Sequence, residues 1–411
     1  QTFIGVQIMS NSGAPGSGAD IRIRGVSSNS DKGLGPLLIV DGLKVDNIQY
    51  LDPDMIESIE VLKDAASAAI YGAQAGNGVV LVTTKHGKSQ TTDGTIFYNG
   101  QWQLSSLSRK LDVLDAKQYI DFETKIGQLK EGWQKLYGYD GHTDVDWGKE
   151  VFEPTWSSRH TIGFQGGNDR GSYFAAINNV NNDGIFKGDK DQYKRLSFQV
   201  NGDYKIKKWL TVGTNNSIEK WNTKKISQQS DNGSALLAAI TTDPLFGPYV
   251  DPDSLDIQLT SSQKAALEKG NKAVLGDGNR YYRISPISGQ TQSSNPFIQR
   301  DRKDEKQEGI NVRGLAYLNF NPINGLIYTS RFGYRISQTT EHSYEAPFVA
   351  NDFVYSDNYT LRGKASTEYY YQWENFINYN KTFADKHDVG AMVGMSWEVT
   401  NSDYVQGTVS G

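Results

Sequence analysis

The chain has 411 residues, enough for two or more domains, or for one domain and part of a larger one. Its 42 Lys and Arg against 47 Asp and Glu give a formal net charge of −5, so no basic surface for nucleic acid is expected. The chain contains no cysteine, which excludes disulfides and thiolate metal sites. Its longest aliphatic runs, LLIV (37–40) and VVLV (79–82), are far shorter than the about 20 residues of a membrane-spanning helix.

The N-terminal part of the sequence predicts a small α/β domain. Asp52 and Pro53 supply a capping oxygen and a fixed φ, so a helix is expected to start there. IEVLK (59–63) alternates like a strand, and GVVLVTTK (78–85) has the continuous apolar run of a buried strand. Between them, AASAAIYG (65–72) predicts a helix of small residues that is ended by its glycine.

These motifs come in a specific order. IRIRG (21–25), IVDG (39–42), IESIEVLKDAASAAIYG (56–72) and NGVVLVTTK (77–85) together resemble the plug domain of TonB-dependent outer-membrane receptors. The resemblance is strongest to the SusC/RagA-like nutrient importers of Bacteroidota. It implies an α/β plug domain, N-terminally incomplete, over residues 1–88. Several motifs in order are a more specific signal than any single glycine pattern.

After residue 90 the sequence changes to segments in which apolar and polar residues alternate. Leu196, Phe198 and Val200, for example, alternate with polar residues, as expected for a strand with one apolar and one polar face. The 23 Tyr, 16 Phe and 8 Trp suit a membrane barrel, whose interfaces carry aromatic residues. Nine strands are predicted, at 94–104, 159–167, 171–180, 194–204, 208–219, 309–320, 325–336, 367–379 and 387–399.

The connections between these strands alternate in length. Tight turns are predicted near 168–170, 205–208, 321–325 and 384–386, and longer connections separate them. This alternation is typical of outer-membrane barrels, which have short periplasmic turns and long extracellular loops. We therefore predict that residues 89–411 form the first part of an antiparallel membrane β-barrel with the plug domain in its lumen. The segment 173–213 again resembles two hairpins of SusC-like barrels.

Three further expectations follow from this barrel. The longest connection, 221–308, should lie outside the cell, contact a ligand or partner, and contain short helices at 234–240 and 261–269. Nine strands would leave two unpaired edges, so we expect the chain to be part of a longer protein. The lipid-facing residues are predicted to include Leu196, Phe198, Val200, Val389, Ala391, Val393 and Met395.

No motif in the sequence predicts an enzyme. The five histidines are scattered, and neither a GxSxG nucleophile turn nor a GxxxxGK phosphate loop occurs. The acidic runs DGHTDVD (140–146) and DPDSLD (251–256) lack the spacing of a calcium loop, so they are interpreted as solvated turns. We therefore expect no cofactor and no metal ion.

Charged residues of the plug are candidates for contacts with the barrel wall. Arg22 and Arg24 are two residues apart in a predicted strand, so both guanidinium groups project from the same face. In the receptors that the plug resembles, such arginines pair with acidic residues of the wall. A solvated arginine pair is the alternative interpretation. The candidate plug–wall contact residues are Arg22, Arg24, Glu57, Glu60, Glu368 and Glu374.

The resemblance also implies a function, TonB-dependent import of a glycan or peptide across the outer membrane. The implied partners are a SusD-like surface lipoprotein, the TonB–ExbB–ExbD complex, outer-membrane lipid and an oligosaccharide or peptide ligand. Two other interpretations stay open: a SusC-like structural subunit of a larger outer-membrane assembly or secretion complex, and a soluble β-rich carbohydrate-binding protein. Aromatic residues of the predicted loops, such as Trp133, Trp147 and Trp156, could stack on sugar rings or pack the loops.

Overall fold

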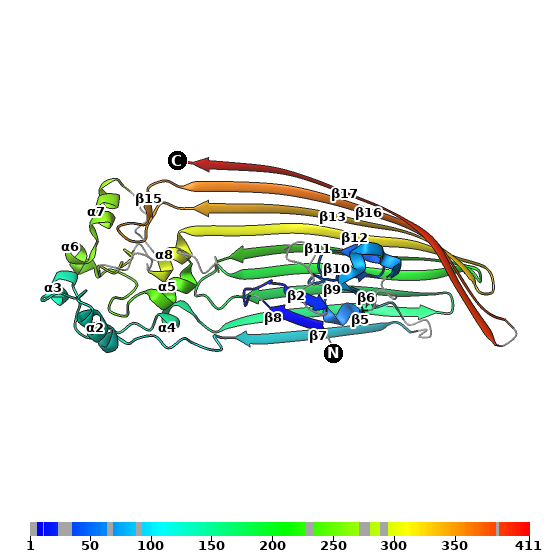
Figure 1. The fold of residues 1–411 in the computed structure, drawn as a ribbon, viewed down its shortest axis with the longest axis horizontal. Helices are drawn as coiled ribbons and strands as arrows, with labels where there is room; N and C mark the ends of the chain where they lie inside the picture. Colours follow the sequence, from blue (N-terminus) through cyan, green and yellow to red (C-terminus); the bar gives the residue numbers. More distant parts are fainter. Residues whose placement is uncertain are drawn as a thin grey trace.

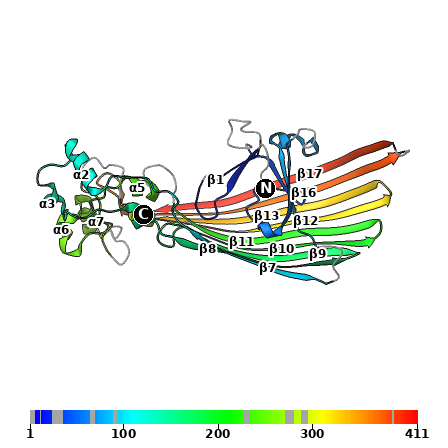
Figure 2. The same ribbon diagram turned by 90° about the horizontal axis from the view of Figure 1, so that it is seen from below.

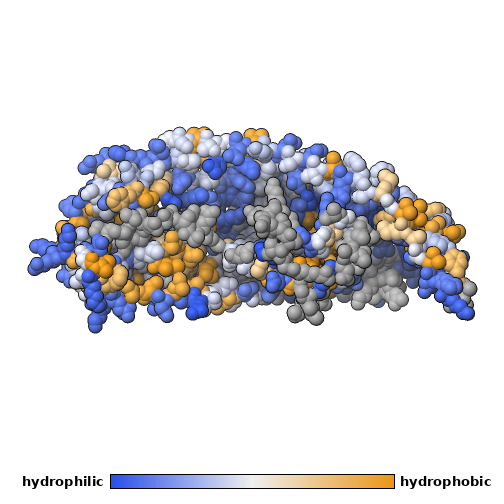
Figure 3. All heavy atoms as spheres, in the orientation of Figure 1, coloured by the Kyte–Doolittle hydropathy of each residue, from blue (hydrophilic) through white to orange (hydrophobic). Residues whose placement is uncertain are grey.

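A long nine-stranded sheet, a small domain lying against one of its faces, and a group of helices at one end make up the computed structural model (Figures 1 and 2). The structure describes residues 6–10, 12–23, 35–63, 69–87, 93–226, 234–270, 280–287, 295–383 and 386–411. Seen from the side of the small domain, the sheet face beside it is largely hydrophilic (Figure 3).

The nine predicted strands all form, and each pairs antiparallel with its neighbour in the sequence order of the sheet. Most of them extend beyond the predicted ends, because the segments next to the long connections carry polar residues on both faces and lose the alternating pattern. The nine strands are β7 Thr95–Ser105, β8 Thr155–Asn168, β9 Gly171–Asp183, β10 Gln192–Lys207, β11 Leu210–Lys225, β12 Lys303–Ile323, β13 Leu326–Glu345, β16 Thr360–Phe383 and β17 His387–Ser410.

The predicted alternation of tight and long connections is confirmed. Two residues separate β8 from β9, where the Asn168 side chain accepts hydrogen bonds from the Arg170 and Gly171 N–H groups at 2.9 and 3.1 Å. The tight turn between β12 and β13 contains Gly325, whose φ of 89° favours glycine. The long connections all emerge at the opposite end of the sheet, where the helices lie (Figure 1).

The exposure of polar and apolar side chains on the two faces of the sheet is the reverse of that in a soluble protein. On β10, Arg195 and Gln199 are 6% and 4% exposed, whereas Leu196 and Phe198 between them are 53% and 42% exposed. Polar side chains therefore face inward toward the small domain, and apolar side chains face outward. This is the pattern of a membrane β-barrel wall, here a curved sheet that is not closed.

The small domain is the predicted α/β plug. Its central sheet has the order β4–β3–β6–β5, in which β3 and β6 are parallel, and a separate hairpin pairs β1 with β2. Its apolar core packs directly on the wall residues Leu315 and Tyr370. The plug strands are β1 Val6–Ser10, β2 Ala19–Ile23, β3 Leu37–Val40, β4 Leu43–Val45, β5 Ile56–Leu62 and β6 Val79–Thr84.

Two local predictions in the plug need correction. Asp52 does cap a helix, but this is a single 3-10 turn, η1 Pro53–Met55, and β5 already begins at Ile56 because its backbone pairs with β6. The predicted helix 65–72 lies partly outside the described residues. Its described end belongs to η2 Ala69–Asn77, which continues past Gly72 although that glycine, with a φ of 68°, interrupts the helical backbone.

The predicted domain boundary at residue 88 stays a prediction. The last plug strand, β6, ends at Thr84 and the first wall strand, β7, begins at Thr95. Residues 88–92 lie outside the described ranges.

The long connections fold into a helical region at the loop end of the sheet (Figure 1). The two predicted helices are confirmed as α5 and α7, each with a hydroxyl side chain as its N-cap. Trp147 and Trp133 are buried in two separate apolar clusters, so both pack the loops. No helix among the described residues is long and apolar enough to cross a membrane. The elements are α2 Ala116–Lys125, α3 Trp133–Tyr137, α4 Trp147–Val151, α5 Ala235–Thr241, η3 Pro252–Ser254, α6 Leu255–Gln258, α7 Ser261–Glu268, α8 Pro296–Asp301, β14 Phe348–Val349 and β15 Tyr355–Ser356.

Candidate functional site

The turn between β3 and β4, made by the VDG part of the IVDG motif, presses the plug against the wall. Asp41 turns the chain with a φ of 52° and accepts hydrogen bonds from the Thr84 N–H and hydroxyl at 2.8 and 2.5 Å. Burial raises the pKa of Asp41 above its usual range, although the Thr84 hydrogen bonds oppose this shift. Gly42 has a φ of 95°, and a Cβ atom there would lie 2.6 Å from Arg331 Nη1. The positive φ therefore favours glycine, and a larger residue would also have to displace the Arg331 guanidinium.

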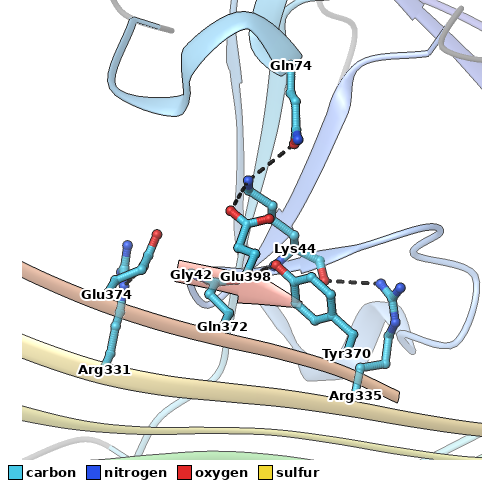
Figure 4. Close-up of polar contacts among 9 residues, drawn as sticks. All are labelled: Gly42, Lys44, Gln74, Arg331, Arg335, Tyr370, Gln372, Glu374 and Glu398. Carbon is cyan, nitrogen blue, oxygen red and sulfur yellow. Dashed lines mark hydrogen bonds and ion pairs between the residues drawn. The ribbon is translucent and has the colours of Figure 1, made fainter. Parts of the chain in front are cut away.

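Three strands of the wall hold this turn through polar contacts (Figure 4). Gln372 on β16, which is 1% exposed, donates to the Gly42 carbonyl at 3.0 Å and accepts from the Lys44 N–H at 3.4 Å. The Lys44 ammonium pairs with Glu398 on β17 and donates to Gln74 of the plug at 3.2 Å. Since Gln372 is satisfied by plug backbone atoms, this wall position is built to receive the turn.

Arg335 on β13 joins a plug carboxylate to a wall carboxylate. Its Nη2 atom lies 2.9 Å from Asp46 Oδ2 and 2.8 Å from Glu368 Oε1, and its Nη1 atom donates to the Lys44 carbonyl at 3.3 Å. The Arg335 side chain is 8% exposed and that of Asp46 is 72% exposed. The plug is thus tied to the wall by an ion pair that opens on one side to the lumen.

A second anchor lies at the Asp52–Pro53 motif. The Asp52 side chain is fully buried, caps η1 and accepts a hydrogen bond from Asn178 Nδ2 on β9 at 2.8 Å. Arg159 Nε on β8 lies 3.7 Å from the same carboxylate. Arg195 on β10 donates to Asn178 Oδ1 at 3.1 Å and to the Gln49 carbonyl of the plug. One carboxylate therefore both starts the turn and binds the wall.

A third anchor lies where the chain leaves the plug sheet. Asn201 on β10 donates to the Thr84 hydroxyl at 2.7 Å and to the Lys85 carbonyl at 2.9 Å. His86 Nε2 lies 2.9 Å from Asn215 Oδ1 on β11. We call the residues of these three anchors the plug seat: Gly42, Lys44, Asp46, Asp52, Thr84, Asn178, Arg195, Asn201, Arg335, Gln372 and Glu398.

The predicted contacts of Arg22 and Arg24 with the wall stay a prediction. Among the described residues no ion pair joins Arg22, half-buried on β2, to the wall, and Arg24 lies outside the described ranges. Glu57 and Glu60 are exposed on β5 and form no ion pair with a described wall residue. The two wall glutamates pair with wall arginines, Glu368 with Arg335 and Glu374 with Arg331. Glu368 thereby reaches the plug through Arg335, not through Arg22.

Sequence reasoning missed most of the plug seat. Gln372 and Glu374 were visible as polar residues of the inward face of one strand, but their plug partners carry no periodic signal. Asp52–Pro53 was interpreted as a helix start and IVDG only as a motif of the resemblance, and both also bind the wall. A polar side chain on an inward strand face was the available signal for Asn178, Asn201 and Gln372.

A cavity of about 920 Å³ opens between the plug and the loop end of the wall. The carboxylates of its lining are all paired: Glu219 with Arg313 at 3.0 Å, Glu305 with Lys303, and both Asp46 and Glu368 with Arg335. The Lys225 ammonium donates to Gln307 Oε1 at 2.9 Å. Hydroxyl and amide side chains supply much of the remaining surface, among them Ser12, Asn47, Gln49, Thr223, Asn311 and Ser337.

The cavity lining includes three aromatic residues, Tyr50, Tyr193 and Trp221. The Trp221 indole on β11 lies across Gly309 on β12, where a Cβ atom would come within 2.8 Å of the ring. The missing side chain at Gly309 lets the indole lie against the wall backbone. Tyr50 of the plug is buried over Arg313, whose Cζ lies 3.8 Å from the ring centre, and burial raises the pKa of Tyr50 well above its usual range.

The two acidic runs lie in the loop region, the second of them largely within η3 and α6. In the first run, burial is the largest single influence on the Asp140 carboxyl and raises its pKa, but hydrogen bonds from Thr143 and from the His142 N–H together outweigh it and lower the pKa to about 2. In the second, Asp251 caps η3 through the Asp253 N–H at 3.1 Å. Within the described ranges no group of three or more His, Asp or Glu could hold a metal ion.

Comparison with known proteins identifies this combination of plug and wall. The family model of the TonB-dependent receptor plug domain matches residues 1–79. TonB-dependent receptor P39 of Formosa agariphila is 28% identical over 98% of this chain, and TonB-dependent receptor SusC of Bacteroides thetaiotaomicron is 27% identical over 95%. In sequence and fold the chain is similar to the SusC/RagA-like TonB-dependent receptors. It covers 36% and 38% of the lengths of these two relatives.

The fold of the receptor chain matches that of a solved importer. The RagAB peptide importer in its closed-closed state aligns with a TM-score of 0.79 and 24% identity, covering 100% of this chain and 46% of that one. Its open-open state aligns with a TM-score of 0.80. In this chain the small domain packs on the inward face of the wall, as a plug does in a barrel lumen.

Proposed function

We propose that the whole protein imports a nutrient oligosaccharide or peptide across the outer membrane, energised by the TonB–ExbB–ExbD complex, together with a SusD-like surface lipoprotein. The observation that carries the proposal is the plug seat. A small domain fills the inward face of the wall and is held there largely by hydrogen bonds and ion pairs. Such contacts can be exchanged for water in a wet lumen, so a pulled plug can leave and return.

The cavity is the proposed ligand site of this importer. It lies on the loop side of the plug, because its lining includes Lys225 and Lys303, at the loop ends of β11 and β12. With the long connections outside the cell, a ligand arriving from outside meets this cavity before it meets the plug. The 221–308 connection would then contact the ligand or the lipoprotein.

Between the two ligand classes, the lining favours an oligosaccharide. Its carboxylates are already paired with Arg and Lys, so a charged peptide would have to replace existing ion pairs. Hydroxyl and amide groups can exchange hydrogen bonds with sugar hydroxyls without such a loss. The Trp221 indole, lying flat against the wall, offers an aromatic face for the C–H face of a sugar ring.

Uptake by whole cells tests the proposal. Cells carrying the full-length receptor should take up a labelled ligand fraction only when TonB is present, and Trp221→Ala should lower uptake more than tenfold if stacking supplies at least about 1.4 kcal/mol. Trp156→Ala is the matched control, since Trp156 is 64% exposed on β8 and lines no part of the cavity. Ligand-independent assembly with other outer-membrane proteins, and no TonB-dependent uptake of any glycan or peptide, would favour the structural-subunit alternative.

A further inference from the structure

A cluster of basic residues lies on the outward face of the wall, near the loop end of four neighbouring strands. Outward-facing residues on these strands are recognised by their buried inward neighbours, such as Arg195, Glu219 and Thr223. The register places Lys224 directly opposite Lys306, and Lys306 opposite His342. The basic cluster consists of Lys194 on β10, Lys220 and Lys224 on β11, Lys306 on β12 and His342 on β13.

The positive charge of this cluster is only partly compensated. Glu308 pairs with Lys306 at 2.8 Å. Within the described part of the chain, Lys194, Lys220 and Lys224 form no ion pair. Two acidic residues, Asp183 on β9 and Asp304 on β12, lie at the border of the cluster. The Asp304 carboxylate already forms an ion pair with the Lys190 ammonium at 2.7 Å.

The opposed pair of Lys224 and Lys306 is unfavourable by itself. Like charges directly opposite each other on neighbouring strands repel, because their Cβ atoms are only about 5 Å apart. Single lysines near a membrane surface need no special explanation, since their long side chains reach water or headgroups. Glu308 compensates only Lys306, so the other three lysines of the cluster favour a further anion beside them.

The position of the cluster relative to the bilayer suggests which anion. On its turn-side border the outward face becomes apolar, with Leu196 on β10, Ile218 on β11 and Ile310 on β12 exposed by 53%, 48% and 42%. On β10 the apolar residues continue to Ile206, about 33 Å along the strand, which at a tilt of about 40° spans an apolar band about 25 Å tall. The basic cluster therefore lies just beyond the band, at the level of the lipid headgroups.

From this position and charge we propose that the basic cluster binds the phosphorylated headgroup of an outer-leaflet glycolipid. Four neighbouring strands about 4.8 Å apart span about 14 Å, wide enough for several lysines to surround one headgroup. A cluster of basic residues beside an apolar membrane-facing band is a typical sequence feature of binding to anionic headgroups. The inference depends on the outward face touching lipid, and it does not depend on import or on any partner.

Native mass spectrometry of the full-length receptor in detergent tests this, with diphosphorylated lipid A and enzymatically dephosphorylated lipid A as the two probes. The wild-type receptor should retain the phosphorylated lipid about tenfold more than the dephosphorylated one. The variant K220Q/K224Q/K306Q should retain both equally. K207Q/K208Q/K386Q, which removes three charges at the tight-turn end, should keep the wild-type preference. Heat-modifiable gel mobility verifies that each variant is folded.

Two results would overturn the proposal. One is a wild-type receptor that does not distinguish the two lipids, which needs no variant at all. The other is a folded K220Q/K224Q/K306Q variant that prefers the phosphorylated lipid as strongly as wild type. TonB plays no part in the measurement, so neither result bears on import.

Discussion

The inner and outer faces of the same nine strands obey opposite rules. On the inner face, Gln372 is 1% exposed and Arg195 6%, and both donate hydrogen bonds to backbone carbonyls of the plug. On the outer face, Val393 is 75% exposed and Leu196 53%. Burial and polarity are thus reversed across one sheet, because one face meets a polar domain and the other meets hydrocarbon.

Because of this difference, the stability of the wall and the stability of the seated plug depend on different interactions. The wall is held by a continuous ladder of backbone hydrogen bonds from β7 to β17, which does not depend on the plug. The plug depends on the plug seat and on two apolar contacts with the wall, one with Leu315 and Tyr370 and one of Met55 with Phe174 and Ala176. A substitution on the outer face should therefore affect insertion of the wall, whereas a substitution in the plug seat should affect the plug alone.

The largest effect is expected for a charge on the outer face. Val393→Arg places a guanidinium in the apolar band and should destabilise the protein folded in vesicles, lowering its free energy of unfolding by about 2–4 kcal/mol. Ser396→Arg on the same strand is the matched control, since Ser396 is exposed on the inward face. Urea titrations of the full-length protein in lipid vesicles measure both. Equal costs at the two positions would mean that β17 has no lipid-facing side.

A pH-dependent effect of similar size is expected in the loop region. Burial raises the pKa of Asp243 to about 6, against about 4 in an unfolded chain. The raised value means that its contribution to stability is complete below about pH 4 and is lost as the pH rises through about 6, by up to about 3 kcal/mol. Burial next to Asp183 raises the pKa of Asp191 to about 6 as well. Thermal melts followed by Trp fluorescence should thus show a more stable loop region at pH 4 than at pH 7, and Asp243→Asn should reduce this difference without abolishing it. An unchanged difference would exclude Asp243 as a cause.

A smaller effect is expected at the turn of the plug. Gly42→Ala combines a positive φ with a clash against Arg331, and should destabilise the seated plug by about 1–3 kcal/mol. Gly72→Ala is the control, because its φ of 68° is equally unfavourable for alanine but no atom lies within 4 Å of the added Cβ. Hydrogen exchange of β3 and β6 amides reports the difference. Similar exchange in the two variants would show that backbone strain alone matters and contact with the wall does not.

The sequence predicted the wall far better than the plug seat. Alternation with a period of two marks a strand such as β10 locally, and hydroxyl N-caps such as Thr260 mark a helix such as α7 locally. The seat instead joins residues that are far apart in sequence, as in the Gln372 to Gly42 hydrogen bond across 330 positions. No local sequence pattern indicates which wall strand a turn of the plug will contact. The strand ends were missed for a related reason, since water wets both of their faces and the alternation disappears.

Conductance of the full-length receptor in planar bilayers tests the central claim, that polar contacts of the plug seat hold the plug in the lumen. The variant K44Q/R335Q removes two ion pairs of the seat and should insert normally but pass more current than wild type, because the wall is intact and the plug is loosened. E57Q/E60Q, on the exposed side of β5, should match wild type. Arg22→Ala, Arg24→Ala tests in the same way the arginine pair predicted from the sequence. Wild-type conductance for K44Q/R335Q, with normal insertion, would contradict the claim.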